Sequence, residues 1–531
     1  MNQHDKNIFL AIGSGLLMSA SFPPINFYVA AYICWIPFFI ALRNLTLIKA
    51  IVLASIFGMT HEFILLSWII PTLTTHANFS WIYAGTITFV ISCILSIWYI
   101  IFGVLIHFTV KKPAHLFVLP FFWVALEWSK QFGPLAFPWE LLGYSQYKFK
   151  YLIQIADCLG VYGVSGLVML INVCIFIFVL FVMDRQWRMY HVSRKLLMYS
   201  ITIATFTLAT TVIYSSIRIA QTDKLICRSN YQSIMTVQPS IPQQEKWQGD
   251  NRISITQKMV QLSYSEKNKA SDLVVWPETA LPYAFHSKHH LRQYVLNAIK
   301  QMHIGVLVGS PSFIDKGDQI FYFNSALLID EKGKIISRYD KVRLVPFSEY
   351  MLFPSFRNLW RFLGAPENKF SSGKEGKTLL LNDIQMGVQI CFEIIFPDYS
   401  RKMVKNGANV LINISNDAWF GRTACPYQHF SMAVFRSVEN KRALIRCANT
   451  GISGMIDPCG RIVSQSKLFE TNTMIHHTPL LHTQTVYSKW GDFFPVIALI
   501  LSLGYVVILQ LPAFVCACLP FASRLIFFIN P

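Results

Sequence analysis

The chain has 531 residues, of which 53% are hydrophobic and only 14% are charged. Soluble domains usually carry about 25% charged residues, so this composition excludes an ordinary soluble protein, and the length exceeds that of one ordinary domain. The formal net charge is +18. Because no run of basic residues is interleaved with aromatic residues, this charge does not indicate a nucleic-acid partner. It is typical of the basic cytoplasmic loops of a membrane protein.

Apolar residues are concentrated in two regions, 7–220 and 487–512, with a polar block between them. A membrane-spanning helix needs about 20 predominantly apolar residues. On that scale the sequence predicts eight spanning helices, at residues 7–22, 26–42, 49–70, 81–110, 114–131, 165–183, 196–219 and 487–511. We therefore predict a membrane domain at 1–220 with about seven helices and an extramembrane domain at 221–485. A last helix and a short cytoplasmic tail follow at 486–531.

Basic residues occupy alternate short loops of the predicted membrane domain. They are Arg43, Lys49, Lys111, Lys112 and four residues within 185–195. The intervening loop at 71–80 contains neither Lys nor Arg. Because basic loops stay on the cytoplasmic side of a membrane, we expect the polar block to lie on the opposite side.

The polar block alternates helices with short strands rich in β-branched residues, which predicts an α/β domain. Three residues suited to catalysis each follow a predicted strand: Glu278 in DLVVWPE, Lys341 in SRYDKVR, and Cys391 at the end of GVQIC. Glu349 comes eight residues after Lys341. A thiol at the tip of a strand can act as a nucleophile when a neighbouring base activates it. The cysteines show no CxxC or metal-ligand spacing, so we predict no metal site.

A glutamate, a lysine and a cysteine in this chain order resemble the Glu-Lys-Cys triad of the nitrilase, or carbon–nitrogen hydrolase, superfamily. Nearly the whole chain is similar to the apolipoprotein N-acyltransferase family. The similar blocks are FPWELLGYSQ (137–146), GVYGVSGLVMLIN (160–172), VQPSIPQQEKW (237–247), WPETALP (276–282), YDKVRLVPFSEY (339–350), GVQICFE (387–393), NISNDAWFG (413–421) and RCANTGISGMIDPCGRI (446–462). One departure is Phe392, where many members of the family carry Tyr, so the ring is kept without its hydroxyl.

The resemblance implies a multi-span helical membrane domain joined to a nitrilase-like α-β-β-α sandwich. It also implies an enzyme that takes an acyl chain from a membrane phospholipid and holds it as a thioester. The acyl chain then passes to the α-amino group of the S-diacylglyceryl cysteine of an apolipoprotein, the last step of bacterial lipoprotein maturation. By the same resemblance Cys391 is the nucleophile, Glu278 the general base and Lys341 the stabiliser of the oxyanion, with no cofactor.

Further positions of the family match residues outside the triad. Glu349, Glu393 and Phe392 match supporting positions, and we expect the two glutamates to orient the catalytic lysine and keep it charged. Trp247 and Trp419 match positions at the entrance for the acyl chain or the lipoprotein. The family also implies a monomer in the bacterial inner membrane, with its catalytic domain facing the periplasm.

Two other kinds of protein are compatible with parts of the sequence. A membrane-tethered amidase or nitrilase that hydrolyses a small amide shares the triad, but it does not need the blocks at 137–146 and 160–172. A transporter with a ligand-binding polar domain usually contains internal repeats, and the sequence has none. Acyl transfer therefore accounts for more of the chain than either alternative.

Two features outside the triad lead to separate expectations. The apolar, aromatic stretch at 350–364 carries Arg357 and Arg361, which predicts a mobile arm at the level of the lipid headgroups. His61 and Glu62 are ionisable residues inside a predicted span, where such groups are costly unless they are paired. We expect these two residues to pair with neighbouring helices.

Overall fold

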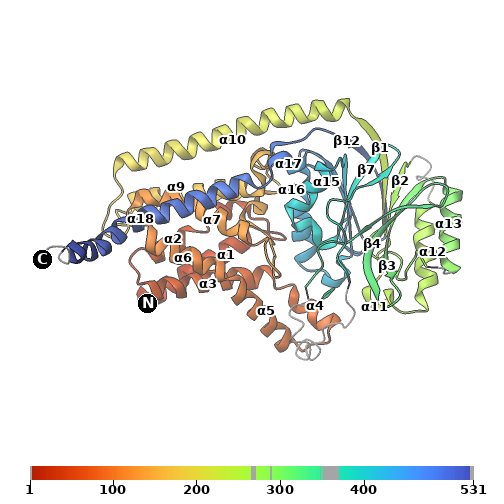
Figure 1. Cartoon of the computed structure of the whole chain (residues 1–531), viewed down its shortest axis with the longest axis horizontal. Coiled ribbons are helices and arrows are strands. Elements are labelled where there is room, and N and C mark those ends of the chain that lie inside the picture. Colours follow the sequence, from red (N-terminus) through yellow and green to blue (C-terminus); the bar gives the residue numbers. More distant parts are fainter. Residues whose placement is uncertain (1–2, 265–270, 288–289, 347, 351–369, 527–531) are drawn as a thin grey trace.

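The computed structural model describes residues 3–264, 271–287, 290–346, 348–350 and 370–526. A bundle of helices forms one end of the molecule and an α/β domain forms the other (Figure 1). The long helix α10 (Arg194–Arg228) runs along the edge of the molecule and leads into the first strand of the α/β domain. The polar block is therefore a domain beside the helical part, as the hydropathy pattern predicts.

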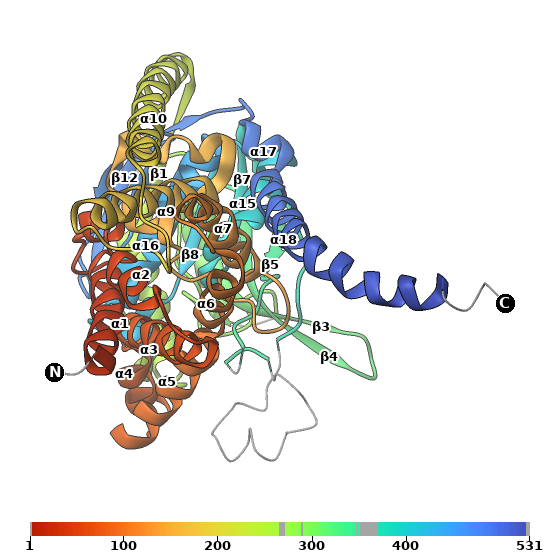
Figure 2. The same cartoon turned by 90° about the vertical axis from the view of Figure 1, so that its left-hand side faces the viewer.

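The helical part is built from both ends of the chain. Its elements are α1 (Gln3–Ala20), η1 (Tyr28–Tyr32), α2 (Ile36–Leu42), α3 (Leu47–Leu65), α4 (Ile69–His76), α5 (Trp81–Leu95), α6 (Ile97–Thr109), η2 (Pro113–Val118), α7 (Leu119–Ser129), η3 (Leu142–Gln146), α8 (Lys150–Ile153), α9 (Ala156–Val182), α10, α17 (Val486–Trp490) and α18 (Phe493–Ile526). The view in Figure 2 shows α18 diverging from the bundle toward its C-terminal end.

Several of these helices are long and apolar enough to cross a membrane. Within the described residues there are four such stretches, at Leu47–Leu65, Trp81–Thr109, Ala156–Val182 and Arg194–Arg228. Shorter apolar helices lie at Tyr28–Leu42 and Phe493–Leu509. This agrees with a multi-span membrane part, whereas the count of eight spans stays a prediction.

The boundaries of several predicted helices differ from those of the structure. The stretches predicted as single helices at 26–42 and 81–110 are each two elements, η1 with α2 and α5 with α6. The stretch predicted as one helix at 114–131 is a 3₁₀ helix followed by the short helix α7, because Pro120 lies in the first turn of α7 and cannot donate a backbone hydrogen bond to a preceding turn. Helix α9 begins at Ala156 rather than at 165. Helix α10 continues to Arg228, beyond the predicted domain boundary, and Asp223 in this extension forms an ion pair with Arg461 of the α/β domain.

The α/β domain contains two six-stranded sheets. The first has the order β12-β1-β2-β3-β4-β5 and the second β11-β10-β9-β8-β7-β6. The strands are β1 (Asn230–Gln238), β2 (Leu273–Val275), β3 (Gly305–Asp315), β4 (Ile320–Ile329), β5 (Ile335–Asp340), β6 (Leu379–Leu381), β7 (Ile384–Ile390), β8 (Val410–Ser415), β9 (Ala443–Ala448), β10 (Gly454–Ile456), β11 (Ile462–Gln465) and β12 (Asn472–Leu480). The central pairs β1–β2–β3 and β7–β8–β9 are parallel.

The longer helices of the domain, α12 (Asn251–Ser263), α13 (His290–Met302), α15 (Pro397–Lys405) and α16 (Cys425–Asn440), cover the outer faces of the sheets. Short helical turns lie at α11 (Gln243–Lys246), η6 (Cys391–Ile395) and η7 (Asp417–Phe420). Side chains of a strand alternate between its faces, so Val274 packs with Met259 of α12 and Ile299 of α13. The next residue, Val275, belongs to the core that also contains Val388 of the second sheet. The layers are thus helix, sheet, sheet, helix, as the resemblance implies (Figure 1).

Helix α16 lies between the second sheet and the helical part (Figure 1). The Glu439 carboxylate accepts a hydrogen bond from the Val161 backbone N–H at 3.0 Å. The Trp139 indole donates to Gln428 Oε1 at 2.9 Å. Because these polar groups are buried and matched, they hold α9 and the loop between α7 and η3 against the helix that covers the second sheet.

Candidate active site

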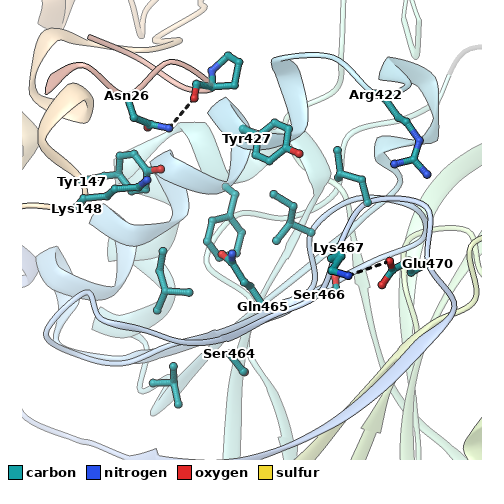
Figure 3. Close-up of a pocket in the computed structure, with 16 residues that line it drawn as sticks. Asn26, Tyr147, Lys148, Arg422, Tyr427, Ser464, Gln465, Ser466, Lys467 and Glu470 are labelled. Carbon is teal, nitrogen blue, oxygen red and sulfur yellow. Dashed lines mark hydrogen bonds and ion pairs between the residues drawn. The ribbon is translucent and has the colours of Figure 1, made fainter.

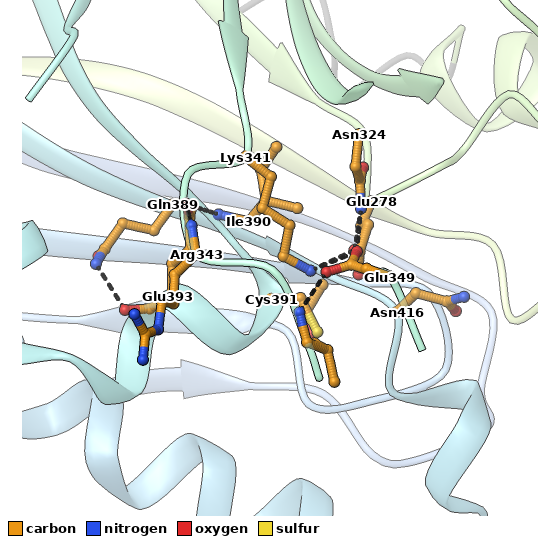
Figure 4. A network of polar contacts seen from close by, with 12 residues as sticks. Glu278, Asn324, Lys341, Arg343, Glu349, Gln389, Ile390, Cys391, Glu393 and Asn416 are labelled. Atoms are coloured by element: carbon orange, nitrogen blue, oxygen red, sulfur yellow. Dashed lines mark hydrogen bonds and ion pairs between the residues drawn. The ribbon is translucent and has the colours of Figure 1, made fainter. Parts of the chain in front are cut away.

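Three residues at strand ends come together where the two sheets meet. Glu278 follows β2, Lys341 follows β5 and Cys391 follows β7. In an α/β sheet the carboxyl ends of parallel strands form the crevice in which ligands bind. Figure 4 shows Lys341 directed toward the carboxylates of Glu278 and Glu349, with the thiol of Cys391 beside them. The structure therefore places the predicted triad in one cluster.

Lys341 is the centre of a buried hydrogen-bonded group. Its Nζ lies 2.8 Å from Glu349 Oε1 and 3.5 Å from Glu278 Oε1. Asn324 joins the two carboxylates, because its Nδ2 donates to Glu278 at 2.7 Å and to Glu349 at 3.1 Å. Burial lowers the pKa of Lys341, but the negative charges of Glu349 and Glu278 outweigh it and raise the pKa above its ordinary value. Lys341 therefore stays an ammonium at neutral pH.

Cys391 has an unusual backbone conformation. Its φ is +53°, in the left-handed region that non-glycine residues seldom adopt and that clusters at functional sites. Burial, together with the nearby Glu278 carboxylate, raises the pKa of the thiol, and the Lys341 charge opposes this only in part. The thiol is thus protonated at neutral pH. A base must remove its proton during the reaction.

Glu393 holds the backbone on both sides of the cluster. Its Oε1 accepts from the backbone N–H of Val342 at 2.6 Å, and its Oε2 accepts from the backbone N–H of Ile390 at 2.7 Å. The Tyr339 hydroxyl lies 3.0 Å from both oxygens. Of the two glutamates expected to orient Lys341, Glu349 contacts its ammonium, whereas Glu393 acts through the backbone next to it.

The turn that begins at Cys391 contacts the helical part through aromatic rings. Phe392 stacks on Phe137, from the loop between α7 and η3, with ring centroids 6.1 Å apart. Phe137 stacks in turn on Trp139 at 5.4 Å, and Trp139 packs 5.5 Å from Trp68. Trp68 lies at the junction of α3 and α4. A chain of rings therefore leads from the membrane part to the residue after Cys391.

The two tryptophans expected at the entrance lie on the surface. Trp247 follows α11 and is 49% exposed. Trp419, in η7, is 39% exposed and packs 4.9 Å from the ring of His76 in α4. Both are accessible, and Trp419 lies at the junction of the two parts.

Sequence reasoning missed several residues of this site. Lys246 is buried, donates from Nζ to the backbone carbonyl of Glu278 at 3.1 Å, and has its pKa lowered by burial to about 7. His429 lies 3.1 Å from the carbonyl oxygen of Cys391. Lys246 lies in the motif VQPSIPQQEKW, and His429 lies in the second turn of α16. The sequence around each residue does not indicate that its side chain is buried, because its hydrogen-bond partner is remote in the chain.

The remaining expectations have separate outcomes. Pairing between helices is confirmed for His61, which lies 3.0 Å from Ser19 of α1, and for Glu62, which lies 3.7 Å from Lys130. The arm predicted at 350–364 falls outside the described residues except for Tyr350. Among the described residues, no group of three or more His, Cys, Asp or Glu side chains is arranged to hold a metal ion.

A separate cavity of about 850 Å³ lies where the outer loops of the helical part meet the second sheet (Figure 3). Its lining includes Asn26 and Lys148 on one side and Arg422 and Lys467 on the other. None of the triad residues is among the described residues that line it. The strand-end cluster, rather than this cavity, is the candidate active site.

Two sheets with a Glu-Lys-Cys cluster at their strand ends define the class of the carbon–nitrogen hydrolases. A sequence model of the carbon-nitrogen hydrolase family matches residues 236–487, and one of the apolipoprotein N-acyltransferase N-terminal domain matches residues 14–174. The chain is 32% identical to the apolipoprotein N-acyltransferase of Geobacter metallireducens over 495 residues, which cover 92% of each chain. It belongs to the apolipoprotein N-acyltransferase family.

Two further comparisons extend this result. The apolipoprotein N-acyltransferase of Rickettsia bellii is 28% identical over 492 residues, which cover 91% of this chain and 93% of the relative. The crystal structure of Saccharomyces cerevisiae Nit3, a member of branch 10 of the nitrilase superfamily, covers 47% of this chain and 90% of Nit3, with 20% identity and a TM-score of 0.37. The relatives confirm the family predicted from the sequence, and the two sheets of this structure confirm the predicted fold class.

Proposed function

We propose that the protein transfers a fatty acyl chain from a membrane phospholipid to the N-terminal α-amino group of a diacylated apolipoprotein. The observation that carries this proposal is the junction between the Cys391 turn and the helical membrane part. A hydrolase of small soluble amides needs the triad but not the contact of Phe137 with Phe392. An enzyme whose donor lies in a bilayer needs its nucleophile next to the membrane part.

The first half-reaction forms a thioester on Cys391. Glu278 takes the proton from the thiol as Sγ attacks the ester carbonyl of the phospholipid. The Lys341 ammonium stabilises the negative charge that develops on the carbonyl oxygen, and removing one such donor typically costs about 10²–10³ in rate. The C–O bond of the ester then breaks. The lysophospholipid leaves with the proton that Glu278 had accepted.

The second half-reaction reverses these roles with a new nucleophile. The α-amino group of the apolipoprotein attacks the thioester carbonyl, and Glu278 accepts a proton from the amine. Lys341 again stabilises the oxyanion. The C–S bond breaks, an amide forms, and the proton returns to the sulfur of Cys391. Because the thiol is protonated in the resting site, each cycle begins and ends in the same state.

We place the enzyme in the bacterial inner membrane with its α/β domain in the periplasm. Basic loops support this orientation. Lys112 lies 5.5 Å above the ring of Tyr190, and the Arg188 guanidinium donates to the His107 carbonyl, so the loops at 110–113 and 184–193 lie together. This cluster is at the end of the helical part remote from the α/β domain (Figure 1). We propose that the enzyme acts as a monomer.

Mass spectrometry of the intact protein tests the proposal. After incubation with phospholipid and no acceptor, the wild type should gain the mass of one acyl chain. Cys391→Ala and Cys391→Ser should gain none and should not acylate a diacylated lipopeptide, because an alcohol is a far poorer nucleophile than a thiol near neutral pH. Cys227→Ala, at an exposed free cysteine in α10, is the matched control and should keep the adduct.

Two results would count against the proposal. An acyl adduct that persists in Cys391→Ala would move the nucleophile elsewhere. A wild type that hydrolyses small amides and never retains an acyl chain would identify a membrane-tethered amidase instead.

A further inference from the structure

The carbonyl group of Cys391 is the end point of a second polar cluster, which lies in the second sheet and α16. We propose that His429 is a positioning residue that holds the Cys391 peptide in its left-handed conformation and so aims the thiol at Glu278 and Lys341. The inference rests on the proposed role of Cys391 as the nucleophile. It assigns to His429 no contact with substrate and no proton transfer.

The hydrogen bond to Cys391 determines that His429 Nε2 carries a proton. Nε2 lies 3.1 Å from the Cys391 carbonyl oxygen, which can only accept. Nδ1 lies between a donor and an acceptor, 2.9 Å from the Arg446 guanidinium and 3.2 Å from Asp417 Oδ1. Burial, followed by the charge of Arg446, lowers the pKa of His429, and Asp417 opposes this shift. Whichever contact Nδ1 makes, Nε2 donates toward Cys391.

Arg446 is itself held rigidly by the second sheet. Its NH2 group lies 2.9 Å from Asp417 Oδ2, and its NH1 group donates to Asn413 Oδ1. Asn413 Nδ2 in turn reaches the same Cys391 carbonyl at 3.4 Å. Two routes thus run from one fixed guanidinium to one carbonyl oxygen, one through the imidazole of His429 and one through the amide of Asn413. The buried state of all these side chains leaves them little freedom.

These contacts have a specific consequence for the nucleophile. The left-handed conformation of Cys391, with φ at +53°, is unfavourable for a residue with a side chain. The cost is of the same order as that of the one or two hydrogen bonds that the carbonyl receives. Without them the peptide can rotate toward an ordinary conformation, which turns the thiol away from the base. Misplacement of a reacting group by about 1 Å can cost about 10²-fold in rate.

Two amide variants form a matched pair for the test. In His429→Gln the amide nitrogen can occupy the position of Nε2 and donate to Cys391, whereas the shorter side chain of His429→Asn reaches only the position of Nδ1. Both are neutral and polar. His429→Phe keeps the ring that packs 5.8 Å from Trp139 and removes both nitrogens. It provides a second variant if His429→Asn does not fold.

The readouts are the single-turnover rate of thioester formation, the KM for phospholipid, the rate of Cys391 alkylation by iodoacetamide, and Tm. We expect His429→Asn and His429→Phe to lose about 10²-fold in both rates at unchanged KM. His429→Gln should stay within about tenfold of the wild type. Equal losses in all three variants, or full rates with only a lowered Tm, would overturn the positioning role. Alkylation needs no acyl transfer, so a failed acyltransferase assay would leave this test intact.

Discussion

Two buried polar clusters flank Cys391, and they differ in what their hydrogen bonds reach. In the cluster of the first sheet, Lys341 bonds to the carboxylates of Glu278 and Glu349, side chain to side chain. In the cluster of the second sheet, the chain of contacts through His429 ends on a backbone carbonyl. The carboxylate of Glu278 can accept a proton from the thiol, whereas the hydrogen bond from His429 to the Cys391 carbonyl fixes the position of the peptide.

The location of each cluster agrees with this division of roles. Glu278, Lys341 and Glu349 lie on loops that follow strands, where side chains can meet a substrate. His429 lies in α16, and its partner Arg446 lies in the central strand β9. A rigid scaffold suits residues that position a nucleophile. Variants in the first cluster should therefore change the chemistry, and those in the second should change the geometry.

The largest effects should come from the first cluster. Glu278→Gln keeps the shape and an acceptor oxygen but cannot take a proton, so thioester formation should fall by about 10²–10⁴-fold. Lys341→Arg keeps the charge, yet it should also fail, because the planar guanidinium does not fit a site built around a point charge 2.8 Å from Glu349. Single-turnover acylation monitored by mass spectrometry measures both changes.

A matched control for these variants is Glu331→Gln, at the turn between β4 and β5, which should acylate at the wild-type rate. An active Lys341→Arg variant would mean that any positive charge suffices at this position. The distinction between chemistry in one cluster and geometry in the other would then lose its main support.

The residues of the first cluster could be predicted from the sequence, and those of the second could not. Glu278, Lys341 and Cys391 each follow an apolar run that predicts a strand, and parallel strand ends meet at one edge. His429 is 38 positions from Cys391 and belongs to a helix. Its contact depends on how α16 packs on the second sheet. Buried partners of this kind arise from tertiary packing and leave no local pattern.

The membrane part shows the same limit. Hydropathy located the apolar helices, but it missed the 3₁₀ helix before α7, which depends on prolines, and the extension of α10 to Arg228, in which Asp223 pairs with Arg461 of the α/β domain. The positions of the apolar helices, which depend on composition, could be predicted from the sequence. The ends of those helices that depend on particular contacts could not.

Glu393 connects the loop of Lys341 to the end of β7, so its replacement should have an intermediate effect. Its carboxylate binds backbone N–H groups of Val342 and Arg343, beside Lys341, and of Ile390, before Cys391. Glu393→Gln offers one acceptor oxygen in place of two, and an unsatisfied buried N–H costs about 1–3 kcal/mol. We expect about a tenfold fall in kcat with little change in the KM for phospholipid, together with a lower Tm.

Tyr339→Phe is the control for Glu393, because it removes one hydroxyl and leaves the backbone bonds of the carboxylate in place. Its kcat should stay closer to the wild type. If Glu393→Gln instead raised the KM alone, Glu393 would contact substrate and would not act by joining the Lys341 loop to β7 through the backbone.

The smallest effect concerns Lys246, which lies beside the first cluster but bonds to a backbone carbonyl as His429 does. Burial lowers its pKa to about 7 in the folded protein, against about 10.4 in an unfolded chain. Between these values the unfolded state binds one more proton, so the free energy of unfolding rises with pH, by at most about 1.4 kcal/mol per pH unit. Lys246→Met removes this slope and also the hydrogen bond to Glu278, whose loss is independent of pH. The Tm of the variant, measured in micelles relative to the wild type, should therefore be highest near pH 6 and decline toward pH 9.

Lys300→Met, at an exposed lysine of α13, should leave the slope unchanged. Parallel Tm curves for Lys246→Met and the wild type would mean that Lys246 keeps its charge throughout, as a permanent fourth charge in the first cluster.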